Sequence, residues 1–170
     1  MAHNESTHGI TACFTSGLLT ATGAVTTYDT TVTIQYAQDG VMKTAKTAVT
    51  TGATPTTDAV TGLAFPALVG GASVANTPGK GCIVVWSLLD GTVKCQMGPH
   101  EALDMAGNFV KAPQFPAVLA LSVPFAYQVL KAGATASATA IVFGTANWNA
   151  TGFTNSIKNV SQLPSRPVVS

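Results

Sequence analysis

Residues 82–97, CIVVWSLLDGTVKCQM, decide the fold of this chain. An almost unbroken apolar run, Cys82 to Leu89, is followed by Asp90-Gly91 and by a returning run, Thr92 to Met97. Asp-Gly between two such runs predicts a β-hairpin, because a type I′ turn needs two residues that tolerate a positive φ angle. The continuous apolar run predicts a strand that is buried on both faces of a sheet. The register set by the turn places Trp86 opposite Cys95.

A second hairpin is predicted upstream of the first. Ile34 and Tyr36 alternate with polar residues, and Asp39-Gly40 supplies another turn of the same type. Its register places Tyr36 opposite Lys43 and Ile34 opposite Ala45. Threonine supplies much of both strands, which suits a sheet with one face toward water or a neighbour.

The remainder of the chain also favours extended structure. Short apolar runs bounded by turn-forming residues predict further strands at 116–121, 124–130, 138–144 and 153–160. Only residues 100–106 have helical character, and Gly107 ends them. We therefore predict an all-β protein, with a single antiparallel β-sandwich or jelly-roll-like barrel in residues 13–170. An extended N-terminal arm is predicted in residues 1–12, which are polar and aperiodic.

The composition is unusually poor in charge. Only 9% of the 170 residues are charged, against about 25% in ordinary soluble domains. The formal net charge is +1, below the magnitude of ~2–8 that keeps a small domain in solution. With no run of Lys or Arg, we expect no nucleic-acid binding through phosphate neutralisation. A surface so poor in charge predicts contact with copies of the chain or with another protein.

Membrane insertion and export are not expected. Apolar stretches such as Pro116 to Leu121 are far shorter than the ~18 residues of a membrane span. Residues 1–8 have neither the basic nor the apolar region of a secretory signal. We therefore expect synthesis in a cytoplasm, with no partner in a membrane.

The chain offers few residues for catalysis or metal binding. Its seven acidic residues are scattered, and Asp39 and Asp90 are explained by hairpin turns. The segment from His100 to Asp104 has an aspartate where the zinc-protease helix has its second histidine. The three cysteines are odd in number and lack C-x-x-C spacing, which indicates buried free thiols. We expect no enzyme activity, no cofactor and no metal site.

Aromatic residues near the C-terminus are the other binding signal. Trp148 lies between two asparagines, as in loops that stack on sugars, but Trp is also enriched where subunits meet. The scarcity of charge favours the second interpretation, and the first remains the alternative. The residues that we select as candidates for an interface are Trp148, Phe153, Tyr127, Arg166, His3 and His8.

The C-terminal half resembles a known class of protein. The segments that carry this resemblance occur in order: CIVVWSLLDGTVKCQMG at 82–98, FP at 115–116, VPFAY at 123–127, KAG at 131–133, FG at 143–144, NWNATG at 147–152 and LPSRP at 163–167. Together they resemble small virion structural proteins of tailed bacteriophages, over about residues 80–167. No such resemblance covers the N-terminal half.

The resemblance implies a non-enzymatic head protein of the decoration or cement type on the capsid exterior. Such proteins are β-sandwich or jelly-roll-like units, arranged as dimers or trimers over capsid symmetry axes. The implied partners are the major capsid protein and the chain itself, with a homotrimer expected before a homodimer. A receptor- or carbohydrate-binding module of a fibre or tail is the alternative, and it depends on the Trp148 loop.

Overall fold

A computed structural model describes residues 9–15, 18–21, 26–70, 79–133, 141–145 and 153–169. These residues contain no helix, and every pairing between their strands is antiparallel. The largest sheet has the order β11-β10-β7-β8, with β9 added beside the start of β7. Its strands are β7 (Lys80–Leu89), β8 (Thr92–Met97), β9 (Glu101–Ala102), β10 (Val123–Ala132) and β11 (Phe153–Asn159).

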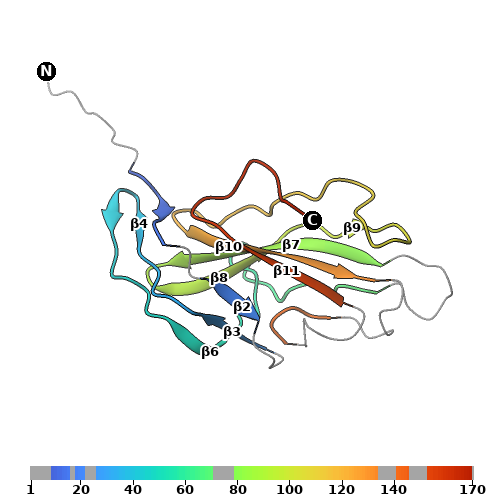
Figure 1. Cartoon of the computed structure of the whole chain (residues 1–170), viewed down its shortest axis with the longest axis horizontal. Coiled ribbons are helices and arrows are strands. Elements are labelled where there is room, and N and C mark those ends of the chain that lie inside the picture. The colour runs from blue at the N-terminus through green and yellow to red at the C-terminus, as the bar shows by residue number, and fades with distance from the viewer. Residues whose placement is uncertain are drawn as a thin grey trace, which may run out of the picture.

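The N-terminal half forms two small sheets, which lie against one face of the large sheet (Figure 1). One has the order β1-β4-β5, from β1 (Ala12–Cys13), β4 (Tyr36–Gln38) and β5 (Val41–Met42). The other has the order β2-β3-β6, from β2 (Leu19–Ala21), β3 (Thr27–Thr30) and β6 (Val49–Ala53). The prediction of an all-β, sandwich-like protein is confirmed, whereas the strands do not close into a barrel.

The hairpin of β7 and β8 is confirmed in detail. Trp86 pairs with Cys95, as the turn predicted. Asp90 and Gly91 have φ angles of 47° and 76°, the left-handed values that a type I′ turn requires. Residues 81–88 are all buried, so this strand is covered on both faces. The strand also begins two residues before the predicted start.

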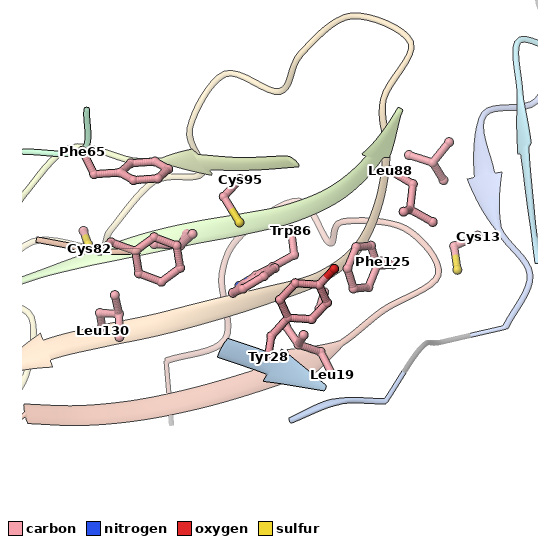
Figure 2. Packing of buried hydrophobic residues seen from close by; sticks show 14 of the residues in the cluster. Cys13, Leu19, Tyr28, Phe65, Cys82, Trp86, Leu88, Cys95, Phe125 and Leu130 are labelled. Carbon is pink, nitrogen blue, oxygen red and sulfur yellow. The ribbon is translucent and has the colours of Figure 1, made fainter. Parts of the chain in front are cut away.

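The face of the large sheet toward the small sheets holds the main hydrophobic core (Figure 2). Trp86 lies at its centre, with its ring centroid 5.2 Å from that of Tyr28 on β3 and 5.7 Å from that of Phe143. Cys13, Leu19 and Leu130 belong to the same cluster, so strands far apart in sequence share it. This core attaches the N-terminal half to the C-terminal half.

Amide side chains provide polar contacts within the large sheet and between the layers. The indole Nε1 of Trp86 donates to Oε1 of buried Gln128 at 3.1 Å, and Nε2 of Gln128 donates to Oδ1 of Asn155 at 2.8 Å. At one edge, Oδ1 of Asn159 on β11 accepts from the backbone N–H of Leu19 on β2 at 2.7 Å. Neutral groups thus satisfy one another where β11 meets β2, without burying a charge.

The opposite face of the large sheet, here called the outer face, is covered by irregular chain. Ile83 and Val85 of β7 form a second core with Tyr127 and Val129 of β10. Side chains from the segments 109–118 and 160–169 pack onto it, on the side opposite β2, β3 and β6 (Figure 1).

Gly81 lets one of these segments approach the sheet closely. A Cβ atom at Gly81 would lie 2.7 Å from the ring of Phe109. The missing side chain therefore leaves the space that Phe109 fills.

The helical character expected of residues 100–106 is wrong. Glu101 and Ala102 pair with β7 as β9. The carboxylate of Asp104 then accepts hydrogen bonds from the backbone N–H groups of Ala106 and Asn108, at 2.9 and 2.8 Å. An aspartate that binds backbone groups in this way competes with helix formation.

The upstream hairpin is confirmed near its turn and shifted farther away. The backbone N–H of Lys43 donates to the carbonyl of Tyr36, as predicted, but Ile34 pairs with Lys46 instead of Ala45. One extra residue therefore lies on the returning side, a local irregularity that the turn rule does not predict.

The predicted arm is described only from Gly9 onward. The carbonyl of Ile10 accepts from the N–H of Gly40, and the hydroxyl of Thr11 accepts from the N–H of Asp39. Ala12 belongs to β1. Residues 9–12 are thus bound along the β4–β5 turn, and residues 1–8 lie outside the described residues.

Gln128→Leu tests the buried amide network. Leucine is similar in size to glutamine, but it removes the acceptor of the Trp86 indole N–H. An unmade buried hydrogen bond costs about 1–3 kcal/mol. We expect the free energy of unfolding in urea to fall by that amount. The same substitution at exposed Gln162 should change it by less than about 0.5 kcal/mol. A Gln128→Leu protein as stable as the parent would contradict this role.

Candidate functional site

The six candidate residues do not form one cluster among the described residues. Trp148, His3 and His8 lie outside the described residues. Phe153 begins β11 opposite Ala132 and packs, half-buried, against the main core. Tyr127 is buried on the outer face, and Arg166 is exposed in the C-terminal segment.

Tyr127 serves the chain internally by holding the C-terminal segment in place. Its hydroxyl accepts from the backbone N–H of Val168 at 3.0 Å, and its ring meets Phe115 edge-on with centroids 5.1 Å apart. Both neighbours belong to the cover of the outer face. Two of the candidates are thus linked, because Tyr127 fixes the segment that carries Arg166.

Between the covering segments lies a groove that the sequence did not predict. Residues from 108–115 and from 165–169 form its walls, and Lys131 of β10 contributes at one end. It consists of two hollows of about 530 and 440 Å³. Both hollows are lined by the same four residues, Ala112, Pro113, Arg166 and Pro167. We call this site the outer groove.

The outer groove is positively charged. Lys111, Lys131 and Arg166 line it, and none of its described lining residues carries a carboxylate side chain. The ammonium nitrogen of Lys131 lies 5.2 Å from the ring centroid of Phe109, a cation–π contact. These cations come from three separate segments, so no local motif could have revealed them. The glycine at 81 was the one available sign of a close approach to β7.

The cysteines behave as core residues. All three are free and buried, and burial raises the pKa of Cys82 to about 12. Burial, and then the charge of Asp58, raise the pKa of Cys95 well above its usual value. A thiol is nucleophilic only as the thiolate, so neither group is prepared for covalent chemistry.

Asp58 is the buried carboxylate among the described residues, and its bonds are structural. One oxygen accepts from the backbone N–H groups of Val60 and Thr61, at 2.9 and 3.0 Å. The other accepts from the N–H of Met97 on β8 at 2.9 Å. Asp58 therefore anchors its loop to the large sheet.

His100 and Asp104 lie just before and just after strand β9. Hydrogen bonds from Asn108, and then from the backbone of the turn, hold the pKa of exposed Asp104 below its usual value. Burial, and then the charge of Lys80, lower the pKa of His100. His100 Nε2 lies 3.4 Å from the sulfur of Met97.

Within the described ranges, no three His, Cys, Asp or Glu side chains are grouped as a metal site would require. The same residues include no helix long and apolar enough to cross a membrane. Comparisons with protein-family models, with curated proteins and with solved structures find no match for this chain.

Thiol labelling tests the burial of the cysteines. At pH 8 the native protein should react with a thiol reagent at less than one site per chain, because its thiols are buried and protonated. In guanidinium chloride all three cysteines should react. Rapid labelling of the folded protein would contradict the packing described for them.

The lowered pKa of His100 predicts a dependence of stability on pH. Because the unfolded chain binds this proton at a higher pH than the folded chain, stability falls as pH drops through about 6.5 toward the folded pKa. His100→Gln should make urea midpoints change less between pH 7.5 and pH 5.5. If the urea midpoint changes equally between these two pH values in His100→Gln and in the parent, His100 does not contribute to the acid sensitivity.

Proposed function

We propose that this chain is a non-enzymatic decoration protein of a phage capsid. It forms a homo-oligomer, with a homotrimer favoured over a homodimer, and it binds the major capsid protein on the capsid exterior. Binding to the assembled shell and not to its free subunits stabilises the head by mass action. The proposal rests on the resemblance of the C-terminal half and on the nature of the surface.

The structural observation that supports the proposal is an apolar strand edge on β5, beside residues 9–12. β5 is an edge strand, and its residues Val41 and Met42 are each 60% exposed. Ile10, which is 65% exposed, lies beside the same turn through its bond to Gly40. We call these three exposed side chains the β5 edge.

Such an edge needs a cover. Unpaired N–H and C=O groups of an edge strand recruit other strands, and proteins that stay monomeric protect their edges with charge, proline, a bulge or a very short edge strand. β5 is short, with two residues, but its exposed side chains are apolar, a valine and a methionine. Strand addition by a second copy would cover the edge, and a surface with few charges allows the contact without burying unpaired ones.

One pair of charged side chains lies close to the β5 edge. Lys43, next to β5, forms an ion pair with Asp90 at 3.0 Å and thereby joins the two hairpin turns. At 33% and 66% side-chain exposure, this pair adds little stability. The two residues of β5 itself, Val41 and Met42, are uncharged and exposed.

The test compares phage particles assembled with and without this protein. Purified protein added to undecorated heads of the phage that encodes it should bind and raise the temperature at which the heads disrupt. Met42→Lys should weaken self-association and binding, because it places a charge in the covered edge. Val110→Lys is the matched control, since Val110 is 70% exposed and lies in the loop after β9.

Protein that remains monomeric and fails to bind undecorated heads would contradict the proposal. Glycan binding that is lost in Trp148→Ala while oligomerisation is retained would favour the alternative, a receptor- or carbohydrate-binding module. Equal effects of Met42→Lys and Val110→Lys would show that the β5 edge is not the surface of contact.

A further inference from the structure

The outer groove contains positive charge that none of its described lining residues balances. Its three cations are Lys111, Lys131 and Arg166, three of the eight Lys and Arg residues in the chain. Among the described residues the one ion pair is Lys43–Asp90, which lies outside the groove. Positive charge gathered in a concave surface attracts a ligand of opposite charge.

The carboxylate of Asp104 contacts the groove wall through Asn108, which lines one of the hollows. It accepts from both the backbone N–H and the side-chain Nδ2 of Asn108, at 2.8 and 3.3 Å, and from the N–H of Ala106. These bonds direct its oxygens into its own turn. The carboxylate is therefore committed to the turn and does not fill the groove.

The aromatic residues of the groove are already packed. Phe109 lies against Gly81 and beneath the ammonium of Lys131, and Phe115 meets Tyr127 edge-on. Recognition of bases in single-stranded nucleic acid depends on stacking against free aromatic faces. Charge and hydrogen bonding are thus the means of recognition that this groove offers.

We propose that the outer groove binds an extended peptide segment that carries carboxylates. Arg166 lines both hollows, so its planar guanidinium can bind a carboxylate with two parallel hydrogen bonds between them. Lys111 lines one hollow and Lys131 the other, and each offers a point charge. Exposed Gln114 and Ser165 supply polar groups for the peptide backbone.

The size and rigidity of the groove suit this ligand. Each hollow, at about 530 and 440 Å³, falls in the range of small-ligand sites, and the two hollows share four lining residues. Pro113 and Pro167 restrict the backbone of the two walls, and the Tyr127–Val168 hydrogen bond fixes the second wall. A preorganised site loses little entropy on binding.

Fluorescence anisotropy with a labelled hexapeptide of alternating Glu and Gly tests the proposal. We expect saturable binding that weakens between 0.1 and 1 M salt, as the Debye length falls from about 10 to about 3 Å. Lys111→Gln and Arg166→Gln should each weaken binding by about two- to fivefold, and the double variant by about tenfold. Lys46→Gln, the same change of charge outside the groove, should leave the affinity unchanged.

Other results would overturn the proposal. Absence of binding, equal binding of the matching Gln peptide, or equal losses in Lys46→Gln would each show that the groove does not recognise carboxylates. Tighter binding of a sulfated oligosaccharide or of single-stranded DNA would assign it to another class of ligand. Peptide binding and head binding are measured separately in the Lys111→Gln/Arg166→Gln double variant. Failure of one proposal can therefore be distinguished from failure of the other.

Discussion

The burial of β7 on both faces is the constraint on which the structure depends. Residues 81–88 are all buried, so the chain must supply a cover for each side of this strand. The N-terminal half covers one side with two small sheets, and irregular segments from 109–118 and 160–169 cover the other. Both the β5 edge and the outer groove result from these covers. The first is where a small sheet ends, and the second is where two covering segments leave a gap.

Neutral polar groups perform the tasks that charged residues perform in many proteins. Gln128 links Trp86 to Asn155 inside the main core, and Asn159 joins β11 to Leu19 at the edge of the layers. The described carboxylates of Asp29, Asp58 and Asp104 bind backbone N–H groups in turns and strands. Low charge is therefore consistent with a well-bonded interior. It leaves the surface with few means of preventing association.

The parts of the fold that could be predicted were those that local rules determine. Asp90-Gly91 set the register of the main hairpin because its turn geometry fixes which residues face each other. The helical character expected of residues 100–106 was wrong, because pairing of β9 with β7 and the bonds of Asp104 depend on neighbours that a local pattern omits. At the outer groove, Arg166 was selected from the sequence. Lys111 and Lys131 were missed, since only the folded chain brings them to the same surface.

A surface with few charges and an apolar strand edge favours contact with other protein. Sedimentation velocity of the purified chain over a range of micromolar concentrations measures whether copies of the chain supply that contact. We expect a defined oligomer, a trimer in preference to a dimer, that dissociates only on dilution. A chain that sediments as a soluble monomer at every concentration would contradict this expectation, because its exposed edge would then need no partner.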